Sequence, residues 1–136
     1  MSMRRKGREL ALQMLYQRDI MQQSDSEIEA SVSKLRNSSK NAWSFAHQLF
    51  KGTVDRIVVI DATIEKSADT WRLDRMATVD RNILRLAVYE LMETDTPKPV
   101  VINEALETAR CFSSADSVAF VNGVLEATCD FMDAAV

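Results

Sequence analysis

The chain has 136 residues, of which 46% are hydrophobic and 27% charged, so it can bury the core of one folded domain. Its 3 Gly and 2 Pro are too few for the many turns of a sandwich or barrel, and an all-β fold is excluded. The net charge of −3 argues against general nucleic-acid binding, and the longest aliphatic run, residues 57–60, is far shorter than the ~20 residues of a transmembrane helix.

The first half of the chain predicts three helices. Apolar residues at three- and four-residue steps predict a helix over about residues 3–22, in which Gly7 weakens the first turn and leaves the arm before it frayed until something binds. Cap chemistry at residues 24–27 predicts a short helix over 25–36, followed by a loop at 37–39. The strongest periodicity runs from Phe45 to Trp71 and predicts one long helix of about seven turns. Gly52 interrupts it as a kink or a close-packing site.

The second half predicts three more helices. One opens at residues 78–80, and residues 94–99 break it because both prolines lie there. The next carries a buried stripe from Val101 to Phe112, and residues 113–116 form a loop and N-cap before a last helix that buries Val118 to Met132. The expected architecture is a compact all-α bundle of six or seven helices.

Charge is distributed unevenly along the chain. Residues 1–18 hold 5 basic and 1 acidic side chains, a net +4, whereas the other 118 residues hold 12 basic and 19 acidic ones, a net −7. Cations at a helix N-terminus oppose the helix dipole, so folding alone does not explain them there. The basic segment Arg4, Arg5, Lys6 and Arg8 is therefore a candidate for phosphate contact, and the alternative is a solvated arm that only aids solubility.

The sequence predicts no catalytic or metal site. The single histidine, His47, lies within a helical pattern, and Glu104 and Glu107 are typical of a solvated helix face. Cys111 and Cys129 are too few and too far apart for a zinc cluster and are expected to be free thiols in a reducing cytoplasm. No Gly-rich phosphate loop or nucleophile elbow occurs, so we expect a non-enzyme without metal or cofactor.

Two asparagines lie at or near apolar stripes. A buried Asn must find hydrogen-bond partners, so Asn103 and Asn122 are expected to form a polar clamp between the last helices. Next to Asn122, Gly123 is expected to let another helix approach closely.

Three segments carry a resemblance to a known family. They read DRNILRLAVYEL at residues 80–91, PVVINEALETAR at 99–110 and SVAFVNGVL at 117–125. In order and spacing they resemble the NusB family of bacterial transcription antitermination factors. The arginine-rich start followed by ALQMLY at 11–16, and LFKGTV at 49–54, are also similar to that family. The resemblance spans essentially the whole chain, although residues 22–42 match only in being helical and variable.

The resemblance implies an all-α, single RNA-binding domain over residues 1–136, built of two helical halves at about 1–72 and 73–136. It implies a non-catalytic factor that binds single-stranded boxA-type RNA together with NusE, a small-subunit ribosomal protein. This assembly belongs to an RNA polymerase antitermination complex that supports read-through in ribosomal RNA operons. The implied location is the bacterial cytoplasm, with no membrane partner and no cofactor.

The resemblance also implies site residues. Arg4, Arg5, Lys6 and Arg8 correspond to the RNA-binding segment, and further positions near the RNA path are Tyr16, Phe112, Asp116 and Ser117. Asp80 and Arg81 open the helix whose outer face is similar to the ribosomal-protein contact. For Tyr16, both a base contact and core packing stay open. Ala119 stands where some relatives carry a basic residue.

Two other functions remain as alternatives. NusB-like domains also precede the catalytic domain of some ribosomal RNA methyltransferases, but a chain that ends at Val136 is expected to have no room for a methyl-donor domain. The other alternative is a helical protein-interaction module in which the basic segment is inert. The sequence is compatible with both a monomer and a homodimer.

Overall fold

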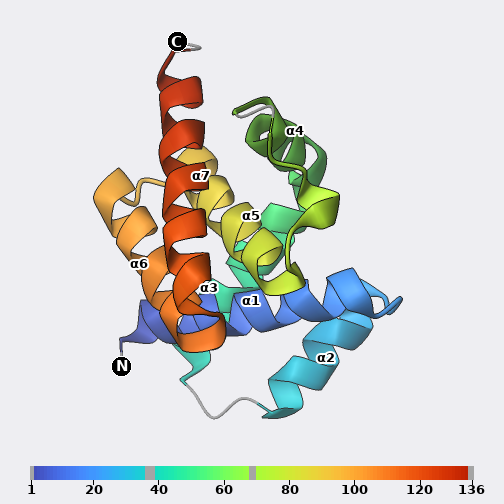
Figure 1. The fold of residues 1–136 in the computed structure, drawn as a ribbon. Coiled ribbons are helices and arrows are strands. Elements are labelled where there is room, and N and C mark those ends of the chain that lie inside the picture. The colour runs from blue at the N-terminus through green and yellow to red at the C-terminus, as the bar shows by residue number, and fades with distance from the viewer. Residues whose placement is uncertain (1, 36–38, 68–69, 135–136) are drawn as a thin grey trace.

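The computed structural model describes residues 2–35, 39–67 and 70–134 (Figure 1). Within these ranges the chain forms helices and no strand, which confirms the predicted all-α fold. The elements are α1 Met3–Ile20, α2 Asp25–Leu35, α3 Lys40–Asp55, α4 Ile57–Ser67, the 3₁₀-helix η1 Leu73–Arg75, α5 Thr78–Glu93, α6 Lys98–Phe112 and α7 Ala115–Ala134. In these ranges, no helix combines the length and the apolar character needed to cross a membrane.

Helix α1 is regular from its first turn, so the expected frayed arm is wrong. The Ser2 hydroxyl caps the helix by accepting the Arg5 N–H at 3.1 Å. Gly7 is buried against α3, where an added Cβ would lie 2.6 Å from the Phe45 ring and 3.1 Å from the Ala42 carbonyl oxygen. The glycine therefore serves the close approach of two helices, and packing outweighs its low helix propensity.

The cap predicted before the second helix is a reciprocal capping box. The Ser24 N–H donates to the Glu27 carboxylate at 3.1 Å, and the Glu27 N–H donates to the Ser24 hydroxyl at 3.2 Å. The hydrogen bonds from Ser24 lower the pKa of Glu27 below its ordinary value. In the loop predicted at 37–39, residues 37 and 38 lie outside the described ranges, and Ser39 caps α3 by accepting the Ala42 N–H.

The single long helix predicted over residues 45–71 is wrong, because the chain forms two helices there. Helix α3 ends at Asp55, and the backbone N–H of its C-cap Arg56 donates to the Gly52 carbonyl oxygen; α4 begins directly afterwards. The break redirects α4 so that Ile60 and Ile64 are buried in the cluster with α5 and α7. Trp71 lies beyond α4 and packs edge-to-face on Phe120 of α7, with ring centroids 6.2 Å apart.

Three expectations about the last helices are also wrong. The break between α5 and α6 covers residues 94–97, since Pro99 lies in the first turn of α6, where its missing N–H is tolerated. Asn103 is exposed, and half-buried Asn122 donates only to Glu126 on its own helix, so they form no clamp. Nothing lies within 4 Å of a Cβ added to Gly123, so no helix approaches closely there.

The core consists of two buried clusters that share helices α1 and α5. One joins residues of α1, α2 and α3, with Leu86 of α5 among them. The other joins α4 to α7, with Leu12 of α1 among them. In Figure 1, α1 runs across the lower part of the molecule, above α2 and behind the end from which α7 begins. Helix α4 thus packs with the C-terminal helices, while the division into halves near residue 72 stays a prediction.

Gly52 is a close-packing site, and this generates a stability prediction. A Cβ at Gly52 would lie 2.2 Å from the ring of Tyr89, which is packed against both core clusters. Overpacking costs about 1–3 kcal/mol, whereas alanine contributes only ~1 kcal/mol over glycine in a helix. We therefore expect Gly52→Ala to lower the free energy of unfolding, measured by urea denaturation.

Gly123→Ala is the matched control, because the same change in α7 meets open space. It should raise the free energy of unfolding by up to ~1 kcal/mol. If both substitutions changed the free energy of unfolding by the same amount, the contact with Tyr89 would not restrict the size of the side chain at position 52.

Candidate nucleic-acid interface

The predicted basic segment lies on the first two turns of α1, but its members differ in exposure. Arg4 and Arg5 are exposed and Lys6 is half-buried, whereas Arg8 is buried. The Arg4 guanidinium lies 5.0 Å from the centre of the Phe45 ring, close enough for a cation–π contact. Three of the four predicted cations are therefore open to solvent, and the fourth faces the interior.

Arg8 forms a two-pronged ion pair with Glu90 of α5. Its Nε and Nη2 each donate to one carboxylate oxygen at 2.8 Å, a geometry that matches the guanidinium fork to the carboxylate. Burial lowers the pKa of Arg8, but the hydrogen bond and charge of Glu90 and the charge of Glu104 raise it above the ordinary value. The guanidinium stays charged and is bound within the fold. Sequence reasoning missed Glu90, although an acid within the apolar run at residues 83–91 was the available signal.

Glu104 of α6 connects the buried pair to the exposed cations. One of its carboxylate oxygens accepts from Arg5 Nε at 3.1 Å, and the other lies 3.8 Å from Arg8 Nη1. The expectation that both glutamates lie on a solvated face of α6 therefore holds for Glu107, which pairs with Arg110 on the surface. It is wrong for Glu104, which pairs with Arg5 of α1. We call Glu90, Arg8, Glu104 and Arg5, in this order, the charge chain.

An apolar groove lies beside the basic segment and brings together three predicted RNA-binding residues. Lys6 and Tyr16 of α1 and Phe112 at the end of α6 line it, along with Glu9, Leu10, Leu12, Gln13 and Val79. Tyr16 is 37% exposed and Phe112 50% exposed, so core packing of Tyr16 is excluded. Two aromatic rings beside a lysine form a surface on which bases can stack next to a bound phosphate.

Asp80 joins the start of α5 to the connection between α6 and α7. Its two carboxylate oxygens accept from the hydroxyls of Ser113 and Ser117, each at 2.8 Å. Ser114 caps α7 by accepting the Ser117 N–H at 3.2 Å. Asp80 and Ser117 are therefore buried and bound inside the protein, whereas Asp116 is exposed. This cluster fixes the connection that follows Phe112.

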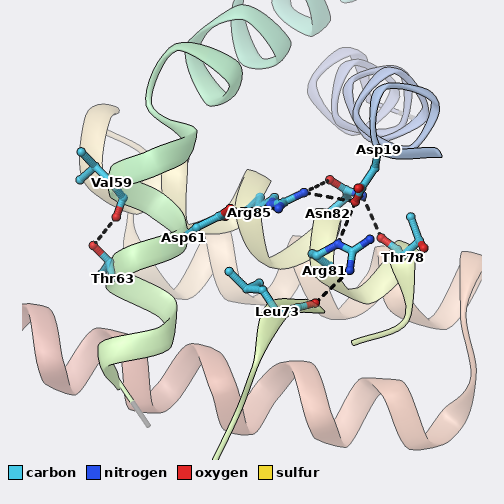
Figure 2. A network of polar contacts seen from close by, with 9 residues as sticks. All are labelled: Asp19, Val59, Asp61, Thr63, Leu73, Thr78, Arg81, Asn82 and Arg85. Carbon is cyan, nitrogen blue, oxygen red and sulfur yellow. Dashed lines mark hydrogen bonds and ion pairs between the residues drawn. The ribbon is translucent and has the colours of Figure 1, made fainter. Parts of the chain in front are cut away.

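Arg81 belongs to a second polar network, drawn in Figure 2. Its Nε donates to Asp19 at the end of α1 at 2.8 Å, and its Nη1 donates to the Leu73 carbonyl oxygen at 2.9 Å. Asn82 and Arg85 also donate to Asp19, and Arg85 binds both carboxylate oxygens of Asp61 on α4. The network ties α1, α4, η1 and α5 together.

The other candidates for chemistry stand apart from this interface. His47 is exposed and lies 3.3 Å from Glu29 of α2. Cys111 and Cys129 are free cysteines, as predicted, and burial raises the pKa of the Cys129 thiol. Across the part of the chain that the structure describes, no three His, Cys, Asp or Glu residues gather as a metal site would require.

Comparisons with known proteins agree over the length of the chain. The model of the NusB family matches residues 5–130. The transcription antitermination protein NusB of Koribacter versatilis is 51% identical over 133 residues, covering 96% of this chain and 91% of that protein. The NusB of Solibacter usitatus is 46% identical, covering 93% and 88%.

Solved structures agree with this. A crystal structure of the antitermination factors NusB and NusE in complex with dsRNA is similar with a TM-score of 0.84 and 30% identity, covering 94% of this chain and 96% of that chain. The solution structure of NusB from Aquifex aeolicus has a TM-score of 0.88 and 30% identity, covering 99% and 93%.

The buried Arg8–Glu90 pair generates a second stability prediction. Removing one partner of a buried ion pair costs about 3–5 kcal/mol, because the other charge stays buried; here Glu104, 3.8 Å from Arg8, compensates it only in part. We expect Glu90→Gln to lower the free energy of unfolding by this order, measured by urea denaturation. The double variant Arg8→Met with Glu90→Leu, which leaves no charge, should lose less. A Glu90→Gln protein as stable as the parent would contradict this account of the pair.

The Asp19 network generates a pH prediction. Burial raises the pKa of Asp19, but hydrogen bonds from Arg81 and Asn82 and the charges of Arg81 and Arg85 outweigh it, so the pKa is lowered. A lowered folded-state pKa stabilises the protein above the ordinary aspartate pKa of about 4, and the stabilisation is lost as pH falls through the folded-state value. Asp19→Asn should reduce stability at neutral pH and flatten its decline towards about pH 3.

Urea midpoints measured across this pH range test the prediction. Asp74→Asn is the control, because Asp74 is exposed and pairs only with nearby Arg72 in the described structure. It should leave the pH profile unchanged. An Asp19→Asn profile parallel to that of the parent would rule out the network as the source of acid sensitivity.

Proposed function

The chain belongs to the NusB family of transcription antitermination proteins, and we propose that it binds single-stranded boxA-type RNA together with the ribosomal protein NusE. The observation that carries the proposal is the position of the exposed cations of α1 beside the aromatic groove. The similar structure of NusB and NusE in complex with dsRNA supports NusE and RNA as partners, and the choice of single-stranded RNA rests on the groove.

In the proposed complex, Arg4, Arg5 and Lys6 contact phosphates, and Tyr16 and Phe112 stack on bases. Stacking on a side chain requires a base that is not paired within a duplex, which favours single-stranded RNA at the groove. Asp116 is exposed at the start of α7 and is proposed to line the RNA path. Arg8 and Ser117 are buried, so their proposed contribution is to hold α1 and α7 in position.

Binding of NusE is proposed on the side of the molecule where α5 begins. Asp80 and Arg81 are bound within the fold, so they shape this surface from beneath. Outside residues 1–18 the chain carries a net −7, and ribosomal proteins are typically basic. Opposite charge speeds association and orients the partners, so NusE would extend the RNA-binding surface of a protein that offers few cations itself.

We further infer that the protein acts without catalysis, as a component of an RNA polymerase antitermination complex in the bacterial cytoplasm. The names of the relatives, transcription antitermination proteins, support the place in transcription.

The experiment is a titration of fluorescent boxA RNA, its scrambled version and its duplex, with and without NusE, at several salt concentrations. We expect preference for single-stranded boxA, stronger with NusE. Three phosphate contacts give a slope of log affinity against log salt near −2, from about −0.7 for each contact to a single strand. Replacing Arg4, Arg5 and Lys6 by Ala should bring the slope close to zero.

The control replaces three exposed cations by Ala, which removes the same charge elsewhere: Lys66 of α4, Arg72 directly before η1 and Arg75 of η1. Measured without NusE, this protein should retain the parent's preference for boxA. Equal, negligible binding of all RNAs by the parent even with NusE would overturn the proposal. The remaining function would then be a helical interaction module with an inert basic segment.

A further inference from the structure

We propose that Glu104 determines RNA selectivity: it holds Arg5 by one edge and lowers the attraction of the basic segment for RNA of any sequence. The inference rests on the proposed function and concerns the outer end of the charge chain. In the order Glu90, Arg8, Glu104 and Arg5, the exposed fraction of the side chains rises from 3% and 6% to 17% and 47%. Alternating charges thus run from the core to the surface.

Glu104 holds Arg5 in a way that leaves its phosphate-binding fork out of the contact. The hydrogen bond uses Arg5 Nε, at 3.1 Å from the carboxylate oxygen. The two terminal nitrogens, which form the other edge of the planar guanidinium, take no part in this bond. An arginine fixed by its Nε edge presents that fork in one direction, as recognition of a single phosphate position requires.

Glu104 is itself fixed by the buried end of the charge chain. Its other carboxylate oxygen faces Arg8 Nη1 at 3.8 Å, and Arg8 is bound by both oxygens of Glu90. Because three of the four groups are mostly buried, the carboxylate cannot follow Arg5 outward. The position of Arg5 is therefore set by the packing of α1, α5 and α6 before RNA arrives.

This arrangement acts differently on matched and unmatched RNA. The negative charge of Glu104 repels every phosphate that approaches Arg5, which weakens binding of all sequences. A pre-placed Arg5 loses less conformational freedom on binding, but only an RNA with a phosphate at that position gains from it. For the matched RNA, the gain from a pre-placed Arg5 offsets the repulsion by Glu104. Other RNAs meet the repulsion without this gain, so selectivity rises at the expense of affinity.

The test measures the affinities of Glu104→Gln protein for boxA and scrambled RNA, at several salt concentrations. Glutamine removes the charge and holds Arg5 more weakly, because an amide oxygen accepts a weaker hydrogen bond from a guanidinium than a carboxylate does. We expect scrambled RNA to bind about two- to fivefold more tightly, the range of an exposed ion pair, and boxA to change less. The salt slope for scrambled RNA should steepen by about 0.7, as one more cation becomes effective.

Glu107→Gln is the matched control, with the same charge change three residues further along α6, at a residue that pairs with Arg110. It should alter neither affinity. A second variant, Arg5→Lys, keeps the charge at an exposed position but lacks the Nε edge, so it should weaken boxA binding and leave scrambled RNA unchanged.

The inference and the proposed function fail in different ways. If the parent protein prefers boxA but Glu104→Gln shifts both RNAs by the same factor, or matches Glu107→Gln, Glu104 does not set selectivity. An Arg5→Lys protein with the parent's preference would likewise overturn the inference. If the parent itself shows no preference even with NusE, the proposed function fails first.

Discussion

The buried ion pair between Arg8 and Glu90 sets where α1 lies, and the proposed RNA surface depends on that position. Helices α1 and α5 each contribute to both core clusters, so their mutual register affects nearly every buried contact. Apolar contacts tolerate small shifts along a helix, whereas a two-pronged bond between buried charges does not, because a misplaced charge would remain desolvated. The pair therefore specifies one register for the helix that carries the exposed cations.

Helix α1 serves folding and recognition with different faces. Leu10, Ala11, Met14 and Leu15 are buried among α2 and α3, while Lys6, Glu9, Gln13 and Tyr16 line the groove. The groove residues follow steps of three, four and three, the repeat of one helix face. Because both faces belong to one rigid helix, whatever fixes the core face also fixes the distance from Lys6 to Tyr16. The recognition surface needs no loop to adopt a special conformation.

Periodicity predicted most of the helices, because the signal lies within one segment of the chain. It failed where distant residues decide the structure. The continuous pattern across residues 45–71 gave no sign that α4 turns at Arg56 to pack on α7, and Gly52 revealed its purpose only beside Tyr89. At the site, the resemblance to the NusB family predicted Lys6, Tyr16 and Phe112 as RNA-binding residues, and in the structure these three line one groove. The partners of Arg8 and Arg5 could not be found this way, since they lie on α5 and α6.

This also changes the meaning of the +4 charge of residues 1–18. A count along the chain treats each arginine as available to phosphate, but Glu90 compensates Arg8 and Glu104 compensates much of Arg5. Arg18 pairs with Asp25, so Arg4 and Lys6 remain, and Arg4 already lies over Phe45. The attraction for RNA at long range is therefore much smaller than the count suggests. In the proposed complex, tight binding then has to come from short-range contacts in the groove and from a basic partner on the acidic body. Both of these depend on which RNA and which protein bind.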